Sequence, residues 1–304
     1  MVGLVQSGID ALSLGSLYAL TALGIGLIFS VVRLVNFAQG IYMAFCAYAI
    51  VLPTTGGLSR LFLGALPTYA LVATVLLFGI LLALLSEVVL FRYMRGAQPA
   101  TMMVASFALG AGLQNLLMMI YGSRPVGINL WPGLARLVEV GGVNIPLLQI
   151  VTVVVTLAIL AALSLFLRNT RFGAAMRASA ENFRMAQMLG VPANRIILVA
   201  FAMSGALAAV TALLTLPQTG MASLTMGEGT LLVAFVATVV GGLGSLTGAV
   251  LSAYLIGVIS VLFQIGLPVE VRPFRNAFVY LFVIVVLLLR PQGLFNFGQK
   301  SERI

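Results

Sequence analysis

The chain has 304 residues, of which 62% are hydrophobic and only 8% charged, and its mean hydropathy is +1.17. This composition excludes a soluble globular protein, because apolar runs long enough to cross about 30 Å of hydrocarbon recur along the whole chain. With no histidine and a single lysine, Lys300, the chain can form neither a Ser-His-Asp triad nor a G-x-x-x-x-G-K phosphate loop. We expect one integral membrane domain over residues 1–304 that hydrolyses no ATP itself and holds no metal or other cofactor.

The net charge of +9 comes from basic residues that lie between apolar runs rather than along one face. Retention of positive loops on the cytoplasmic side of a membrane produces this pattern, which argues against nucleic acid as a partner. With the spans given below, eleven basic residues fall on the cytoplasmic side, including the C-terminus, and five outside. The first set is Arg33, Arg92, Arg95, Arg168, Arg171, Arg177, Arg184, Arg195, Arg290, Lys300 and Arg303; the second is Arg60, Arg124, Arg136, Arg272 and Arg275.

The first apolar span covers residues 7–32, and its small side chains suit close packing against neighbouring helices. It ends at Arg33 and is followed by RLVNFAQG, which contains the amide side chains Asn36 and Gln39. This stretch is either an interfacial turn whose polar groups are satisfied, or a gate or a contact to a partner subunit. Asn36 and Gln39 are also candidates for lining a translocation path.

The second span, residues 37–52, is short, whereas the third covers residues 66–91 and ends at Arg92 and Arg95. Those arginines place its end in the cytoplasm. Glu87 lies in this apolar run near the same end, so we expect it to pair with a nearby arginine rather than to carry protons at the membrane centre.

The fourth span, residues 101–121, has the most polar face of all, with Ser106, Gln114 and Asn115. Polar groups in lipid are costly unless they face a cavity or another helix, so this face should point to the interior. Helix packing and lining of a translocation path both satisfy that condition.

Residues 122–145 are rich in glycine and proline, and a small hairpin is expected around Gly141 and Gly142 at the outer surface. Trp131, the only tryptophan, is expected to anchor this region at the interface. The fifth span, residues 146–167, then returns the chain to the cytoplasm.

Residues 168–195 form the one long polar interval and contain five of the 16 basic residues. Apolar residues recur in it at roughly helical spacing, which predicts an amphipathic helix of about a dozen residues outside the membrane core. Ser179 is the expected N-cap, Glu181 falls in the first turn, and Gly190 marks the stop. The helix belongs either to a solvated loop between two spans or to a docking segment for a soluble partner.

The sixth span covers residues 196–216, and residues 217–229 are expected to form an outer loop. Small residues then recur at helical spacing, which predicts a face for close helix contact that includes Gly241, Gly244, Ser245, Gly248 and Ala249. Too few residues precede Gly241 for a full crossing, which favours a discontinuous or re-entrant helix. With a last span at residues 273–289, the fold class is an all-α polytopic membrane protein with eight or nine transmembrane helices.

Four stretches carry a resemblance to a known family, in the family's order and over nearly the full length. They are SLGSLYALTALGIGLIFSVVRLVNFAQG, RASAENFRMAQMLGV, VVGGLGSLTGAVLSAYLIG and RPQGLF. With these marks, the chain resembles the permeases of the branched-chain amino-acid ABC importer family, of the type usually called LivH.

The resemblance implies a subunit of the bacterial inner membrane that works in a larger assembly. Such permeases pair with a second, related permease as a heterodimer, use two cytoplasmic ATP-binding subunits, and receive solute from a periplasmic solute-binding protein. The polar interval resembles the family's coupling segment, which seats a helix in a groove on the ATPase. The matching residues are Ala180, Glu181, Asn182, Ala186, Leu189 and Gly190.

Some positions depart from the family's pattern. The family more commonly has an acidic residue at Asn182, histidine at Gln39, glycine at Cys46 and proline at Thr247. The change at Asn182 is compatible with docking, whereas the others lie in the permease core. The solute therefore remains open among branched-chain amino acids, other amino acids, amides and small carboxylates.

The mechanism predicted for such a permease is alternating access, in which ATP binding to the partner subunits moves the coupling helix and the adjoining spans. A secondary transporter or facilitator channel acting alone is the alternative, because unwound backbone near residues 241–244 is a potential ion site. Ionisable side chains within the spans are few, which argues against that alternative. A structural membrane scaffold is a third alternative. It would need no polar interior face, so Ser106, Gln114 and Asn115 argue mildly against it.

Overall fold

The computed structural model describes residues 2–52, 60–61, 67–140, 143–290 and 293–295. Seven helices in these ranges are long and apolar enough to cross a membrane. They are α1 (Val2–Val32), α3 (Thr68–Ser86), α4 (Pro99–Tyr121), α5 (Leu147–Asn169), α8 (Ala193–Thr219), α10 (Leu246–Gly266) and α11 (Arg275–Leu289). A π-helical turn, η1 (Glu87–Phe91), extends α3, and α11 reaches the length of a crossing only together with the 3-10 turn that precedes it, η3 (Arg272–Phe274).

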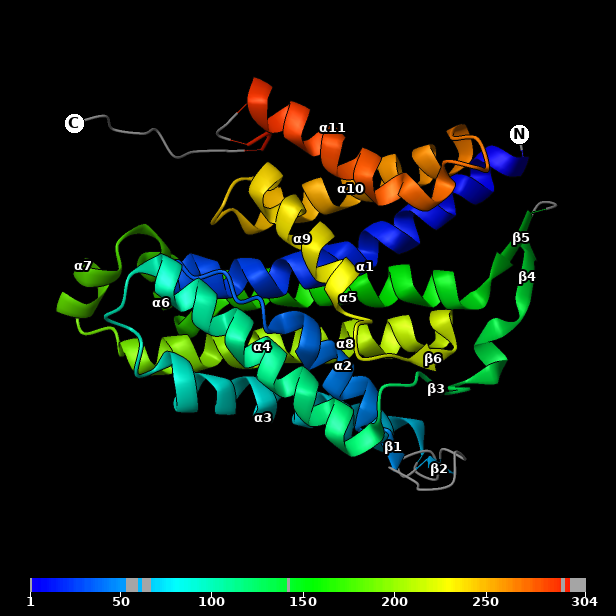
Figure 1. Ribbon diagram of the computed structural model, residues 1–304. Helices are drawn as coiled ribbons and strands as arrows, with labels where there is room; N and C mark the ends of the chain where they lie inside the picture. The colour runs from blue at the N-terminus through cyan, green and yellow to red at the C-terminus, as the bar shows by residue number, and fades with distance from the viewer. Residues whose placement is uncertain (1, 53–59, 62–66, 141–142, 291–292, 296–304) are drawn as a thin grey trace.

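Two shorter helices, α2 (Gln39–Tyr48) and α9 (Glu228–Gly241), begin in the middle of the bundle and run toward opposite ends (Figure 1). The prediction of a helical second span over residues 37–52 was therefore wrong in extent, because the chain returns from α1 as irregular backbone and forms only ten helical residues. Irregular backbone is tolerated at membrane depth where it is buried in protein, and all ten residues of α2 are buried.

The expected outer loop over residues 217–229 is also corrected by the structure. Helix α8 continues through Pro217 to Thr219, and β6 (Met221–Ala222) then pairs with β3 (Val126–Gly127). After this short ladder the chain turns inward and begins α9. Gly227 is buried at this turn, whereas the side chains of Gln218, Thr225 and Glu228 remain exposed.

The order of long helix, irregular segment, half-helix and long helix occurs twice, as α1–α2–α3 and as α8–α9–α10, in opposite directions (Figure 1). Helix α1 packs on α10, and α3 packs on α8, as an internal two-fold relation requires. Both contacts close on glycines: a Cβ at Gly257 would lie 2.6 Å from the Gly15 Cα, and one at Gly205 would lie 2.3 Å from the Gly79 oxygen. Inverted repeats of this kind build many transporters, whose sites lie where the repeats meet.

The molecule has two ends of different character. One end, here called the arginine-rich end, carries α6 (Arg171–Glu181), α7 (Phe183–Met188) and the end of α1 at Arg33 (Figure 1). The opposite hairpin end carries the start of α1 and the antiparallel strands β4 (Leu137–Val140) and β5 (Val143–Pro146), preceded by η2 (Pro132–Ala135). The predicted hairpin is confirmed by the pairing of β4 with β5, although Gly141 and Gly142 lie outside the described residues. A further two-stranded ladder joins β1 (Val51–Leu52) to β2 (Arg60–Leu61).

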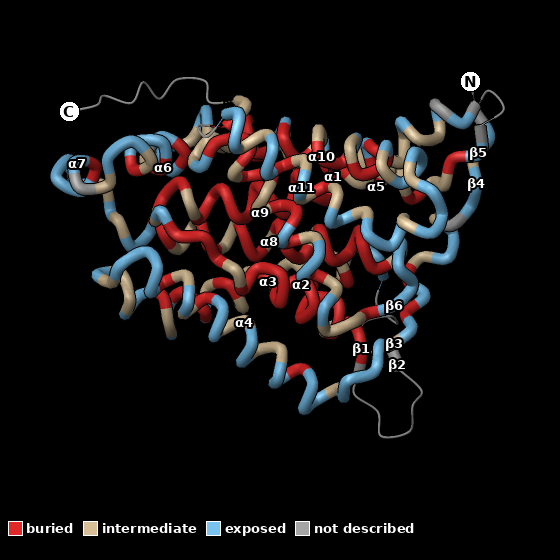
Figure 2. The backbone as a smooth tube through the Cα atoms, turned by 45° about the horizontal axis from the view of Figure 1, so that its top comes forward, coloured by how far each residue is buried: buried red, intermediate tan, exposed pale blue. Residues whose placement is uncertain are grey.

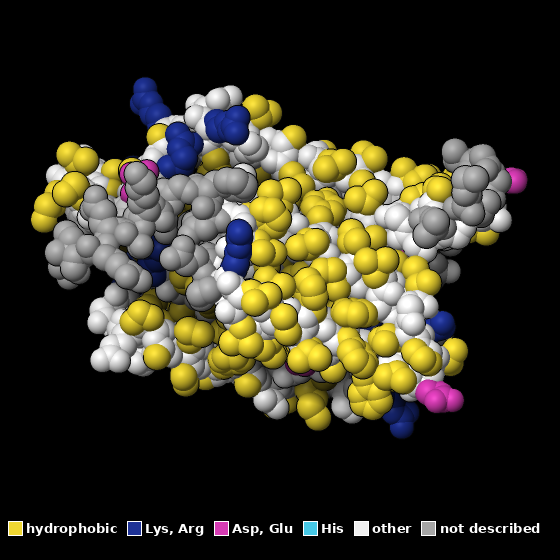
Figure 3. Space-filling model, turned by 90° about the horizontal axis from the view of Figure 1, so that it is seen from above, with side chains coloured by type: hydrophobic (Ala, Val, Ile, Leu, Met, Phe, Trp, Pro, Cys, Tyr) yellow, Lys and Arg dark blue, Asp and Glu magenta, His cyan; other side chains and the backbone are white. Residues whose placement is uncertain are grey.

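Burial is very uneven among the long helices (Figure 2). The most apolar window of α1 is 89% buried, whereas those of α4 and α11 are 11% buried and that of α5 is 17% buried. Hydrophobic side chains also cover the middle of the face that α10 and α11 present, with basic side chains toward the two ends (Figure 3). The exposed apolar faces of α4, α5 and α11 are therefore available to lipid or to another subunit.

The small-residue face predicted after residue 240 is divided by a break. Gly241 ends α9, while Gly244 and Ser245 lie in the turn before α10, so these residues do not share a helix face with Gly248 and Ala249. The expected discontinuous helix is confirmed. Close packing is retained in another form, since a Cβ at Gly241 would lie 2.3 Å from the Gly248 carbonyl carbon.

Candidate functional site

The polar interval forms two helices rather than one. Thr170 caps α6 by accepting a hydrogen bond from the Gly173 N–H at 3.0 Å, and Asn182 caps α7 by accepting one from the Met185 N–H at 3.0 Å. The prediction of Ser179 as the N-cap was wrong, because Thr170 starts the helix earlier and Ser179 is buried within it. The break falls at Asn182, whose extended φ of −148° ends α6.

Gly190 ends α7 as predicted. Its φ is +86°, and the Val191 N–H donates to the Ala186 carbonyl at 3.1 Å, which is a Schellman termination. Ala186 is buried beneath this turn, whereas Met188 and Leu189 are 85% and 80% exposed. The segment therefore presents two large apolar side chains to its surroundings at the arginine-rich end.

The base of this segment is fixed to the membrane helices. Helix α6 packs on α5 and α1 through its buried residues, which include Met176. The Arg33 Nη2 donates to the Ala180 carbonyl at 2.6 Å, and Arg33 itself has a left-handed φ of +58° where α1 ends. Glu181 and Asn182 beyond Ala180 are exposed. Helix α6 thus lies between α7 and the membrane helices α1 and α5 and contacts all three.

The second candidate site lies where the half-helices α2 and α9 meet. A Cβ at Gly227 would lie 2.0 Å from the Gly40 oxygen, so the two chain reversals touch backbone to backbone. The Gln39 Nε2 donates to the carbonyl of Thr21 at 3.5 Å. Thr21 lies about 17 Å before the end of α1, which is about half of a hydrocarbon layer. The half-helices therefore begin near the centre of the membrane.

Three of the polar residues predicted for a translocation path hold this junction together. The Ser204 hydroxyl of α8 donates to the Gln39 Oε1 at 2.8 Å, and the Asn36 Oδ1 accepts from the Ala38 N–H at 3.1 Å. The Ser106 hydroxyl of α4 accepts from the Phe37 N–H at 3.2 Å. Asn36, Gln39 and Ser106 are each 0% exposed, so they brace the irregular chain from within the subunit.

The remaining two predicted residues lie further along α4. The Gln114 Nε2 donates to the Glu228 Oε1 at 2.8 Å, whereas the Asn115 amide donates to the Ala111 carbonyl of its own helix at 2.8 Å. Asn115 and Glu228 are exposed, and Gln114 is half-buried. Glu228, the first residue of α9, thus places its carboxylate near the membrane centre and against Gln114 of α4.

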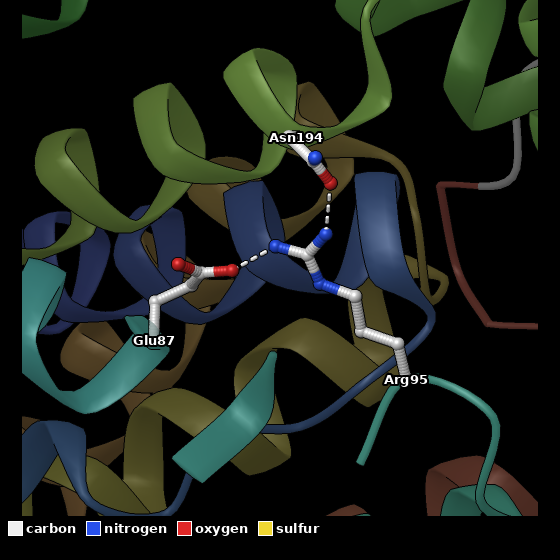
Figure 4. Close-up of polar contacts among 3 residues, drawn as sticks. All are labelled: Glu87, Arg95 and Asn194. Atoms are coloured by element: carbon white, nitrogen blue, oxygen red, sulfur yellow. Dashed lines mark hydrogen bonds and ion pairs between the residues drawn. The ribbon is translucent and has the colours of Figure 1, made fainter. Parts of the chain in front are cut away.

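The carboxylate of the third span is paired as predicted. Glu87 in η1 forms an ion pair with Arg95, which also donates to the Asn194 side chain at the start of α8 (Figure 4). The Glu87 side chain is 0% exposed. This contact ties the end of α3 to the start of α8, where the polar interval of residues 168–195 joins the bundle.

Comparison with known proteins decides the family. A family model described as "Branched-chain amino acid transport system / permease component" matches residues 8–289. The chain belongs to this family. The permease is 33% identical over 300 residues to the high-affinity branched-chain amino acid transport system permease protein BraD of Pseudomonas aeruginosa, with 95% of each chain covered. It is 29% identical to the corresponding LivH protein of Escherichia coli K12, with 95% of the permease and 94% of LivH covered.

More distant similarity covers less of the sequence or the fold alone. The autoinducer 2 import system permease protein LsrC of Yersinia pseudotuberculosis is 34% identical over 137 residues, which are 43% of the permease and 39% of LsrC. Among solved structures, PsaBC from Streptococcus pneumoniae matches with a TM-score of 0.50 at 14% identity, covering 93% of the permease and 91% of that chain. The similarity to PsaBC concerns the fold alone.

The sequence reasoning missed Glu228, because it placed this residue in an outer loop. A signal for it is present in the sequence as an internal repeat. Ala-Gln-Gly at residues 38–40 and Gly-Glu-Gly at residues 227–229 open the two half-helices of the permease, with Gln39 and Glu228 each as the first helical residue. Weak internal symmetry of this kind is how inverted repeats show in sequence.

Proposed function

We propose that this permease is the membrane-spanning subunit of an ATP-driven importer of branched-chain amino acids. It pairs with a second, related permease, and two ATP-binding subunits dock on its arginine-rich end in the cytoplasm. A solute-binding protein delivers the amino acid to the hairpin end on the periplasmic side. The excess of arginine at the end that carries α6 and α7 supports this orientation.

The exposed apolar tip of α7 is the observation that carries the proposal. Met188 and Leu189 project from a short helix that is capped at both ends and anchored through Ala180 to Arg33. A rigid segment with an unburied apolar tip fits a groove on another protein, because burial of large apolar side chains supplies docking energy. ATP binding on the partner then moves α7 and, through α6, the helices α1 and α5.

The test is replacement of both tip residues, as Met188→Ser and Leu189→Ser together. Loss of two buried side chains should cost about 3 kcal/mol of docking energy, or a fall of about 150-fold in affinity for the ATPase subunits. Solute-stimulated ATP hydrolysis by the reconstituted complex should fall with it. Tyr93→Ser is the matched control, because Tyr93 is 82% exposed at the same end but lies outside the coupling segment. Unchanged ATPase association in the double variant would refute this docking surface.

The translocation path follows α4 in this proposal. Helix α4 packs mainly on α2 and leaves its other face exposed, and Gln114 and Glu228 meet at about the depth where the two half-helices begin. A carboxylate there suits the ammonium group of an amino acid, because an unpaired charge of either sign is costly at this depth. Buried Asn36, Gln39 and Ser106 would hold the path in shape from behind.

Glu228→Gln tests this assignment with the side-chain volume retained. Leucine uptake by proteoliposomes that contain the whole complex should show a KM raised at least tenfold, while basal ATP hydrolysis stays unchanged. Glu270→Gln is the control, because it makes the same substitution at an exposed carboxylate after α10, away from α4. Parental uptake kinetics in Glu228→Gln would place the path elsewhere.

A carrier that works alone is the competing function, since half-helices that meet near the membrane centre are also found in secondary transporters. The two functions differ in one measurement. Uptake into vesicles that contain the permease without ATP-binding subunits supports the carrier, whereas uptake that requires those subunits and ATP supports the importer.

A further inference from the structure

A cavity of about 600 Å³ opens at the arginine-rich end, beside α6 and away from the junction of α2 and α9. Its walls come from α1, α5, α6 and the start of α10, and none of its lining residues belongs to α2, α3, α4, α8 or α9. The cavity is therefore separate from the α4 face and from the exposed tip of α7.

The inner wall of this cavity is apolar. Leucines from three helices line it, among them Leu23 of α1, Leu160 of α5 and Leu251 of α10. Leu251 is 47% exposed, so part of this wall lies at the outside of the subunit rather than in its core. An open recess with this lining suits an apolar occupant, because most of the surface that the occupant would cover is apolar.

The rim of the cavity is basic. Arg168 in the last turn of α5 and Arg177 in α6 both line it, and both are exposed. Within the described residues, neither guanidinium forms an ion pair with a carboxylate. The hydroxyl groups of Ser245 and Thr247 lie on the α10 side of the same rim, 3.4 Å apart. The rim thus offers two unpaired cations and hydroxyl donors, which match a phosphate group.

The basic rim and the apolar wall follow one another along α5, in the order of the headgroup and acyl chains of a phospholipid. Leu160 precedes Arg168 by eight residues of one helix, so the apolar wall extends about 12 Å below the arginines. Basic pockets between transmembrane helices on the cytoplasmic side recognise anionic headgroups in this way. We infer that the cavity binds an anionic phospholipid of the cytoplasmic leaflet, with its phosphate between Arg168 and Arg177 and an acyl chain along Leu160 and Leu251.

The site has a regulatory consequence that rests on the proposed orientation and coupling role. Met176, Arg177 and Ala180 all line the cavity, and all belong to α6, the base of the coupling segment. A bound lipid would therefore hold α6 against α1 and α5. Loss of the lipid should loosen the connection between α7 and the membrane helices and lower solute-stimulated ATP hydrolysis.

The experiment is native mass spectrometry of the purified, delipidated chain titrated with phosphatidylglycerol or with phosphatidylcholine. The parent chain should retain phosphatidylglycerol at least tenfold better than phosphatidylcholine. Arg168→Gln with Arg177→Gln should weaken that binding about 30-fold, at about 1 kcal/mol for each arginine. Arg124→Gln with Arg136→Gln, which removes the same charge at the hairpin end, should have no effect.

Leu160→Trp provides a second test that leaves both arginines in place, because it fills the apolar wall. It should abolish retention of phosphatidylglycerol. This variant keeps the inference testable if the double arginine variant fails to fold. Equal binding of both lipids, undiminished binding by the arginine and Leu160 variants, or full competition by free glycerol phosphate would each overturn the inference. Lipid retention is measured without ATPase subunits, so its failure leaves the proposed docking at Met188 intact.

Discussion

Replacement of Arg95 by glutamine should destabilise the permease more than replacement of both Arg95 and Glu87 by glutamine. The Glu87 side chain is 0% exposed and that of Arg95 is 23% exposed. The second Glu87 oxygen, Oε2, has no hydrogen-bond partner among the described residues. Loss of Arg95 therefore leaves a buried carboxylate without its cation.

The size of the effect follows from this burial. Removal of one partner from a buried ion pair costs about 3 to 5 kcal/mol, whereas neutral replacement of both partners is often close to neutral. A loss of about 4 kcal/mol lowers the ratio of folded to unfolded protein about a thousandfold. Arg95→Gln also weakens the contact to Asn194, and therefore the connection between η1 and α8.

Denaturant unfolding in mixed micelles, followed by the fluorescence of Trp131, measures the difference. The unfolding midpoint should fall strongly for Arg95→Gln and recover in the double variant with Glu87→Gln. Arg92→Gln is the control, because Arg92 is exposed three residues earlier and should leave the midpoint unchanged. Equal losses in the Arg95 single variant and the double variant would refute the reasoning.

Three further variants test local packing and capping. Gly205→Leu should prevent close packing of α3 on α8, because even a Cβ there would lie 2.3 Å from the Gly79 oxygen. The yield of folded protein should therefore collapse. Gly112→Ala is the control and should fold normally, because a Cβ at Gly112 would have no atom within 4 Å. Gly190→Ala should cost about 1 to 2 kcal/mol at its positive φ and lower coupled ATP hydrolysis, and Gly190→Asn should recover part of it. Asn182→Ala should cost about 1 kcal/mol of cap energy, measured as faster hydrogen exchange in α7, whereas Asn182→Asp should keep the cap.

The long helices were predictable because each is encoded by its own apolar run. The bounds of α4, α5 and α8 lie within three residues of the expected spans, and α3 extends as expected to the turn that contains Glu87. Pairing of Glu87 was also predictable, because a carboxylate in an apolar run near arginines has few other ways to be satisfied. The stop at Gly190 followed from the local preference of glycine for positive φ.

The polar residues were harder to place. Ser106, Gln114 and Asn115 were predicted to form one interior face of α4, and this prediction was wrong. Nine residues of helix place Asn115 about 180° around α4 from Ser106, so Ser106 is buried whereas Asn115 is exposed. Gln39 meets Ser204, which is 165 residues away, and no local pattern predicts that contact. The position of the α6 cap was missed for a different reason, because two residue types with good capping potential, Thr170 and Ser179, occur in the same segment.

The sequence by itself determined that this protein spans a membrane, where its long helices lie, and which family it belongs to, because hydropathy and the family motifs are read along the chain. Only the tertiary structure decided where the chain turns back within the bundle. The stretch before α9 is polar enough for a loop, yet Gly227 brings it against Gly40 and places Glu228 near the membrane centre. Irregular backbone survives there only because helices distant in the sequence surround it and satisfy its polar groups, and that condition is a property of the packed fold.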